Sequence, residues 1–354
     1  MAHAEPVPFD GSASASRTTD ASDRIAGTRA ETRQWILSRA CDAFFIANIF
    51  WPMLLLLQFA PGFEGRLGIQ FWQLYFITTP HRWSTLLIVL LDQERFQQRK
   101  KAFIAVAVVI VVVCLGVRMT TGALTCLLAV DYLWNAWHFA AQHHGIYRIY
   151  GRLGSDSTSS LDRPEKWLFR GFLLYVIFRT ASAATAPGAI DVWLSRTDWI
   201  SLLIPVWLVS RELKSLNQGF GGRGLYLISL LSLYVSLLWA VNTHRPGIVL
   251  SLATASAWFH ASEYLAIIGW HVQRRANSST ERNILLQWIA PRWGLTLLMY
   301  AIVLGSGSVL MDRDVPELWL LVNVIVAFLH YTYDGMIWKS KRPAGLPSGS
   351  QPES

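Results

Sequence analysis

The chain has 354 residues, of which 53% are hydrophobic and only 15% are charged, and its formal net charge is +8. Apolar runs long enough to cross a bilayer recur along it, which excludes an ordinary soluble globular protein and predicts an all-α polytopic membrane protein. The three cysteines (Cys41, Cys114 and Cys126) are not spaced as disulfide pairs or as a thiolate zinc site.

The chain divides into a long helical domain and two tails. Residues 1–32 are rich in Ser, Ala and Thr without apolar periodicity, which predicts a disordered cytoplasmic tail. Residues 341–354 form a second such tail, and residues 33–340 form the transmembrane domain. About ten spans of roughly 20 residues fit within this domain. Their approximate ranges are 40–60, 70–91, 102–118, 121–142, 167–187, 193–211, 224–242, 247–270, 288–309 and 316–338.

Basic residues alternate between the connecting loops. Loops 92–101, 143–166, 211–223 and 271–287 together hold fourteen Arg and Lys, whereas the intervening loops hold five. Because cytoplasmic loops carry the excess of basic residues, this asymmetry predicts that both termini are cytoplasmic, in a cytoplasmic or inner membrane. It also explains the positive charge without nucleic-acid binding.

Polar residues interrupt the second and fourth spans. In the second, His81 and Arg82 follow Pro80, and His81 lies about 16 Å from the cytoplasmic end at 1.5 Å per residue. Residues 131–145, which begin in the fourth span and continue past its end, read DYLWNAWHFAAQHHG. Their polar residues on one helical face are Asp131, Asn135, His138 and Gln142, and His143 and His144 follow.

The eighth and tenth spans also carry polar pairs. His260 and Glu263 are spaced i, i+3, and His330 and Asp334 are spaced i, i+4. Ionisable residues inside a membrane are costly and usually functional. Imidazole and carboxylate groups from four helices at one depth predict a metal site, with two iron ions favoured by the number of ligands and zinc as the alternative. The candidate ligands are His81, His138, His143, His144, His260, Glu263, His330 and Asp334.

Further roles follow from charge and position. Asp131, Glu263 and Asp334 are the candidate catalytic carboxylates, which bridge metal ions or orient ligands. Arg82 and Arg148 are candidates for binding a substrate head group or a reductant. The aromatic residues near these positions, Tyr264 and Tyr331 among them, are expected in core packing and in the interface belt.

The HFAAQHH run of His138, His143 and His144 resembles one histidine box of the integral-membrane di-iron hydroxylases and desaturases. That resemblance implies dioxygen activation and oxidation of a lipid or hydrocarbon chain. It covers seven residues and only one box, stretched to H-x(4)-H-H. The resulting hypothesis is a membrane metal-dependent oxidoreductase whose partners are membrane lipids, a lipid-soluble substrate and an electron-donor protein.

Other interpretations remain open. Ser256 and His260 resemble the S-x(3)-H element of membrane zinc amidases of the ceramidase type, which hydrolyse lipid amides. The histidine count resembles that of carotenoid-cleaving membrane dioxygenases, which hold one iron with four histidines. A proton- or cation-coupled transporter would use His81, Asp131 and the remaining carboxylates as a relay, and a haem protein would pair two of the histidines.

Overall fold

The computed structural model describes residues 34–57, 59–60, 68–153, 162–185, 189–214, 221–278 and 284–338. Every regular element in these residues is a helix, which confirms the helical fold class. Each of the predicted spans coincides with a helix or with a run of consecutive helices. The two tails predicted to be disordered lie outside the described residues.

The N-terminal part of the domain consists of interrupted helices. α2 (Arg39–Cys41) leads directly into the π-helix η1 (Asp42–Ile46), and α3 (Trp51–Leu57) follows. The two helical segments on either side of this break are bent by 43° relative to each other. The buried carboxylate of Asp42 holds the start of the domain in place, because it accepts hydrogen bonds from the Ile36 amide (2.7 Å) and the Tyr150 hydroxyl (2.8 Å).

The next run changes helix type immediately before His81. α4 (Ile69–Trp72) continues into the π-helix η3 (Gln73–Thr78) and then into α5 (Thr79–Leu91). Pro80 has no amide hydrogen and its ring would crowd the preceding turn of a regular helix, so a wider turn before it relieves both problems. The Thr79 hydroxyl donates to the Leu74 carbonyl across this wider turn (2.8 Å).

The remaining elements are mostly longer helices. Gly122, with φ +67°, ends α7 (Lys100–Thr121) and allows the tight turn into α8 (Thr125–Leu153), since the left-handed conformation suits glycine. The elements are α6 (Gln93–Gln98), α7 (Lys100–Thr121), α8 (Thr125–Leu153), α9 (Asp162–Thr185), α10 (Ala189–Ser201), α11 (Leu203–Lys214), α12 (Gly222–Asn242), α13 (Pro246–Ser278), α14 (Ile284–Ile289), η5 (Ala290–Arg292), α15 (Trp293–Asp314) and α16 (Pro316–Ile337).

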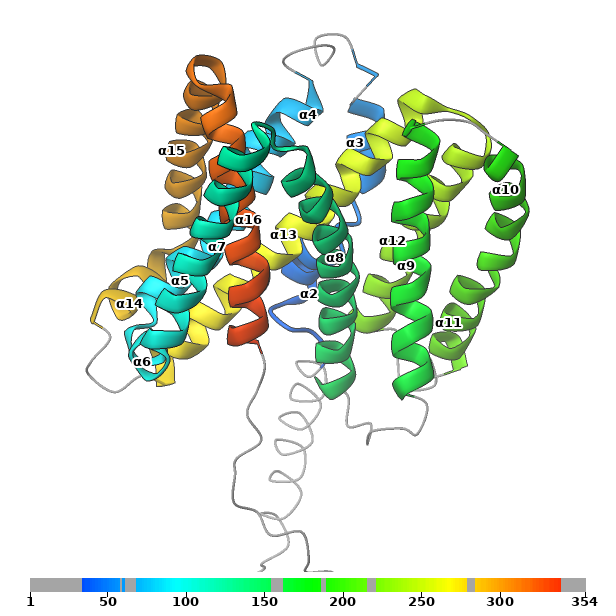
Figure 1. The fold of residues 1–354 in the computed structure, drawn as a ribbon. Helices are drawn as coiled ribbons and strands as arrows, with labels where there is room; N and C mark the ends of the chain where they lie inside the picture. The colour runs from blue at the N-terminus through cyan, green and yellow to red at the C-terminus, as the bar shows by residue number, and fades with distance from the viewer. Residues whose placement is uncertain are drawn as a thin grey trace, which may run out of the picture.

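Helix α13 passes between two groups of helices (Figure 1). On one side α16 packs against α5, α7 and α15, and on the other α12 packs against α9 and α11. Helix α8 contacts both α9 and α16, so it joins the two groups. Phe172, Leu230 and Phe259 are fully buried where α9, α12 and α13 meet. The centre of the bundle is therefore where α5, α8, α13 and α16 can place side chains together.

Four of the described helical segments are long and apolar enough to cross a membrane: Lys100–Thr121, Gly222–Asn242, Gln287–Asp314 and Pro316–Ile337. The bent pair Arg39–Ile46 and Trp51–Leu57 makes a fifth if it counts as one span. The segment Lys100–Thr121 has a mean hydropathy of 2.8 and only 11% of its most apolar window is buried, which suits a helix surrounded by lipid. The other predicted spans fall on helices that are broken or carry more polar residues.

Candidate metal centre

Four histidines from four helices meet in the interior of the bundle. His81 lies on α5, His138 on α8, His260 on α13 and His330 on α16, and none is more than 8% exposed. Each supplies one ring nitrogen to a group in which all four nitrogens lie within 4.8 Å of one another. The four helices predicted to carry ligands therefore do bring one histidine each to a common point.

The rings surround this point edge to face. The ring centroids of His81 and His330 are 4.6 Å apart, as are those of His138 and His330, and the rings of His81 and His260 are 4.9 Å apart. The Nε2 atoms of His138 and His330 are separated by 3.0 Å. Two nitrogens bound about 2.1 Å from one metal ion at a right angle would be about 3.0 Å apart. The spacing therefore fits two neighbouring ligands of a single ion.

Several ring nitrogens in this group form no hydrogen bond with the described part of the chain. His81 Nδ1 and both ring nitrogens of His260 are buried without a hydrogen-bond partner among the described residues. A buried polar atom without a partner costs about 1–3 kcal/mol. A metal ion at the centre binds one ring nitrogen of each histidine, so it would give one of the two His260 nitrogens the partner that the described protein does not provide.

A hydrogen-bond network holds the ring of His330 in one orientation. The Thr85 hydroxyl lies 2.6 Å from His330 Nδ1, 2.5 Å from the Tyr264 hydroxyl and 3.2 Å from Asp334 Oδ1. Tyr264 also donates to the Asp334 carboxylate. If His330 Nδ1–H donates to Thr85, the Thr85 hydroxyl can donate to Asp334, and the lone pair of Nε2 then faces the other histidines. A metal-bound histidine usually donates its other ring N–H to an oxygen acceptor in this way, which fixes the orientation of the ring.

Asp334 therefore supports a histidine through Thr85. Its Oδ2 atom lies 4.0 Å from the Nε2 atoms of both His138 and His330, too far for a hydrogen bond. The i, i+4 pairing of His330 and Asp334 predicted from the sequence is present on α16. Both side chains are buried, at 0% and 7% exposure.

Glu263 and His143 form a second group with His260. One ligand atom from each of the three lies within 4.8 Å of the others. The Glu263 carboxylate is fully buried and is close to three donors: Gln142 Nε2 (2.8 Å), His143 Nδ1 (2.8 Å) and the Tyr226 hydroxyl (2.9 Å). Glu263 is thereby stabilised as a buried carboxylate, and most of its hydrogen-bonding capacity is already used.

Asp131 lies beside the histidine group and outside it. Its Oδ1 atom accepts a hydrogen bond from Tyr331 (2.9 Å), and its Oδ2 atom lies 3.9 Å from Arg82 Nη2. The Tyr331 hydroxyl also lies 3.0 Å from Asn135 Oδ1. Asp131 and Arg82, which were predicted to have separate roles, thus belong to one polar cluster.

Two predicted site residues are placed elsewhere. His144 is buried, but its ring faces Phe169 of α9 at 5.6 Å, and neither group of potential ligands includes it. Arg148 is exposed and lies ten residues beyond His138, about 15 Å along α8. Because α8 continues to Leu153, His143 and His144 lie within a regular helix and point in different directions from His138.

The sequence interpretation missed the parts played by Thr85, Tyr226 and Tyr264. Tyr264 and Tyr331 were expected in packing or at the interface, yet each is buried and hydrogen-bonded to a carboxylate. A usable signal existed, because Thr85 follows His81 by four residues and Tyr264 follows His260 by four. That spacing puts each hydroxyl on the same helical face as a ligand.

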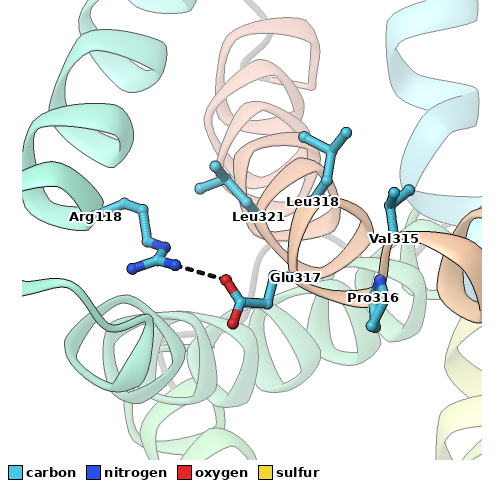
Figure 2. Close-up of a pocket in the computed structure, with 6 residues that line it drawn as sticks. All are labelled: Arg118, Val315, Pro316, Glu317, Leu318 and Leu321. Atoms are coloured by element: carbon cyan, nitrogen blue, oxygen red, sulfur yellow. Dashed lines mark hydrogen bonds and ion pairs between the residues drawn. The ribbon is translucent and has the colours of Figure 1, made fainter.

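A pocket of about 400 Å³ lies away from the histidines (Figure 2). It is lined by the last turns of α7 and the start of α16, where Arg118 pairs with Glu317 at 2.6 Å. Leu318 in this pocket is twelve residues from His330, about 18 Å along α16. No metal ligand group among the described residues includes a residue that lines it.

Comparison with models of protein families, with curated proteins and with solved structures finds no match to this chain.

Proposed function

We propose that the protein is an integral-membrane, non-haem iron oxidoreductase that uses dioxygen to oxidise a lipid or another apolar substrate. The observation that carries this proposal is the convergence of His81, His138, His260 and His330 on one buried point. Imidazole ligands suit iron, copper, nickel and zinc, and the absence of thiolate from the group argues against structural zinc.

The number of histidines favours iron over zinc. Catalytic zinc is usually held by three protein ligands and keeps a fourth position for water, so four histidines would close a tetrahedral zinc site. An iron ion held by these four histidines would keep further coordination positions free, and dioxygen could bind there beside the substrate. Four histidines are also the number of ligands that hold the single iron in the carotenoid-cleaving membrane dioxygenases, which the histidine count of this chain resembles.

One ion suits the geometry better than the two expected from the sequence. Glu263, the carboxylate nearest a second position, is occupied by Gln142, His143 and Tyr226. A second ion there would share His260 with the first and would displace some of these hydrogen bonds. We therefore propose that Glu263 and His143 stabilise the surroundings of a single metal ion and do not bind it. A site with two metal ions is the alternative.

The lipid-hydrolase alternative receives less support. The Ser256 hydroxyl, which would have to act at the metal in a ceramidase-like site, donates instead to Tyr234 (3.1 Å). The transporter alternative would require the carboxylates to form a path. Asp131, Glu263 and Asp334 instead belong to three separate hydrogen-bonded groups.

The proposed substrate reaches the centre from the lipid. Phe139 stacks on His260 with 3.7 Å between ring centroids, and Trp134 and Trp137 on the same helix are about two-fifths exposed. These aromatic surfaces suit an apolar molecule. A hydroxylase or desaturase reaction would take electrons from a donor protein, for which exposed Arg148 remains a candidate contact. A dioxygenase reaction would need no such donor.

The membrane arrangement that accompanies this proposal is the one expected from the basic loops. The chain crosses a cytoplasmic or inner membrane about ten times, with interrupted helices counted as single crossings, and both termini are cytoplasmic. The fourteen-to-five distribution of Arg and Lys supports it.

Elemental analysis of the purified protein tests the proposal. We expect about one iron per chain, together with oxygen consumption that depends on added membrane lipid extract or on a polyene substrate, measured with and without a chemical reductant in place of the electron-donor protein. Removing iron with a chelator should abolish oxygen consumption, and adding Fe²⁺ should restore it. Folded protein that binds one zinc and hydrolyses lipid amides would transfer the assignment to the hydrolase, and folded protein without metal would refute both.

A further inference from the structure

A charged pair beside the metal centre is incompletely bonded. Arg82 on α5 and Asp131 on α8 approach each other at 3.9 Å between Nη2 and Oδ2, which is beyond hydrogen-bond distance. No hydrogen bond and no other ion pair is found for the Arg82 guanidinium among the described residues. A guanidinium has five N–H donors, so most of its hydrogen-bonding capacity is unused there.

The carboxylate of Asp131 is also only partly used. Its Oδ1 atom accepts a hydrogen bond from Tyr331, whereas Oδ2 faces the space towards Arg82. The side chains of Arg82 and Asp131 are 19% and 14% exposed, so each retains some accessible surface. A strong donor and a strong acceptor therefore face each other across a gap that a small polar group can reach.

This gap lies next to the proposed metal position. Arg82 directly follows His81 in the chain, and Tyr331 directly follows His330. The ring of Tyr331 lies against that of His138, with 5.0 Å between centroids. Tyr331 thus contacts both the polar pair and the histidine group.

A partly exposed ion pair within a membrane protein is costly unless its charged groups find further polar partners. A bound hydroxyl group would serve both partners, since it can accept a hydrogen bond from Arg82 and donate one to Asp131. A carbonyl group could only accept, and a carboxylate would be repelled by Asp131. The chemistry of the gap therefore favours a neutral group that both accepts and donates a hydrogen bond, and the hydroxyl of an alcohol is the simplest such group.

We propose that the pair of Arg82 and Asp131 binds the hydroxyl group of an apolar alcohol and so positions its hydrocarbon body next to the four histidines. This inference rests on the proposed function and deepens it by naming the class of substrate. The apolar body would lie against Trp134, which stacks on Phe328 at 5.5 Å and contacts the ring of Tyr331 at 5.6 Å.

The first test compares two probes on the wild-type protein. Retinol and axerophthene differ only by a terminal hydroxyl group, and both accept excitation energy from tryptophan, so each can be titrated by fluorescence in the same detergent. We expect retinol to bind about ten- to a hundredfold more tightly than axerophthene after correction for micelle partition, the range for a hydrogen bond to a charged group. Equal corrected affinities would overturn the proposal, and this comparison needs no variant.

The second test uses variants. Arg82→Gln and Asp131→Asn should each reduce the preference for retinol to less than threefold, whereas axerophthene affinity should change little. Arg118→Gln is the matched control, because it breaks the ion pair with Glu317 at the far end of α16 and should leave the preference intact. If both variants of the pair retain the full preference, the pair is only an interhelical contact and the proposal is wrong.

Iron content is measured on the same preparations. Wild-type protein that prefers retinol but lacks iron would refute the proposed function and leave the hydroxyl site standing. Wild-type protein that holds iron and consumes oxygen, but does not distinguish the two probes, would refute only the hydroxyl site.

Discussion

Replacing Thr85 by valine tests whether the hydrogen bonds behind His330 tune a metal site. Valine preserves the shape of the threonine side chain, which is fully buried, and removes only the hydroxyl group. That hydroxyl contacts three groups: His330 Nδ1 at 2.6 Å, the Tyr264 hydroxyl at 2.5 Å and Asp334 Oδ1 at 3.2 Å. The variant therefore leaves a buried imidazole without the partner that orients it.

The expected magnitude follows from these contacts. Leaving one buried donor unsatisfied should lower the free energy of unfolding by about 1–3 kcal/mol. Losing the group that orients a metal-bound histidine typically weakens metal affinity by about 10- to 100-fold. Since Asp334 keeps its hydrogen bond from Tyr264, we expect a decrease near the lower end of that range.

The assay is competition for Fe²⁺ against a chelator of known affinity, in detergent-solubilised protein. Thr254→Val is the matched control, because Thr254 is also buried, lies on α13 with His260, and donates only to the Leu250 carbonyl (2.8 Å). Thr254→Val should leave the affinity within about twofold. The reasoning is refuted if Thr85→Val binds iron as tightly as wild type, or if both valine variants weaken binding equally.

Three further predictions use the same preparations. His138→Ala should remove most of the bound iron, whereas His144→Ala should retain it because the His144 ring faces α9; equal losses would contradict the four-histidine assignment. Asp334→Asn should lower iron affinity or oxygen consumption by about one to two orders of magnitude. His271→Gln should be nearly neutral, because the His271 ring contacts Trp338 and belongs to neither ligand group among the described residues, and the reverse order would count against the role of Asp334. A cysteine introduced at Arg245 should be labelled from the outside, because the distribution of basic residues predicts that this loop is not cytoplasmic. Labelling from the cytoplasm would contradict that topology.

Helix content and the identity of the ligand-bearing helices could be predicted from the sequence because both depend on local patterns. Apolar runs of about 20 residues have few alternatives to helix in a membrane, since every backbone polar group must be satisfied within the segment. The i, i+3 and i, i+4 spacings of His260 with Glu263 and of His330 with Asp334 likewise specify a shared helical face. The structure places all four residues in the buried centre.

The sequence could have indicated in part that His138, His143 and His144 on α8 point in different directions. At about 100° per residue, His143 lies about 140° around a helix from His138, and His144 lies on a third direction. A continuous α-helix cannot point all three at one ion, and α8 is continuous through this region. The box-like run HFAAQHH predicted three ligands because its spacing was compared with a motif without regard to helical rotation.

Which histidines meet was decided only by tertiary packing. Helix α13 passes between the group containing α5 and α16 and the group containing α12, and α8 reaches both groups. This crossing brings His260 into contact with His81 and His138, and brings the Tyr264 hydroxyl to Thr85. Periodicity along one helix specifies the face that a residue occupies. The helix that covers this face, and the depth at which the two cross, depend on the shapes of all the neighbouring helices and cannot be read from any one segment.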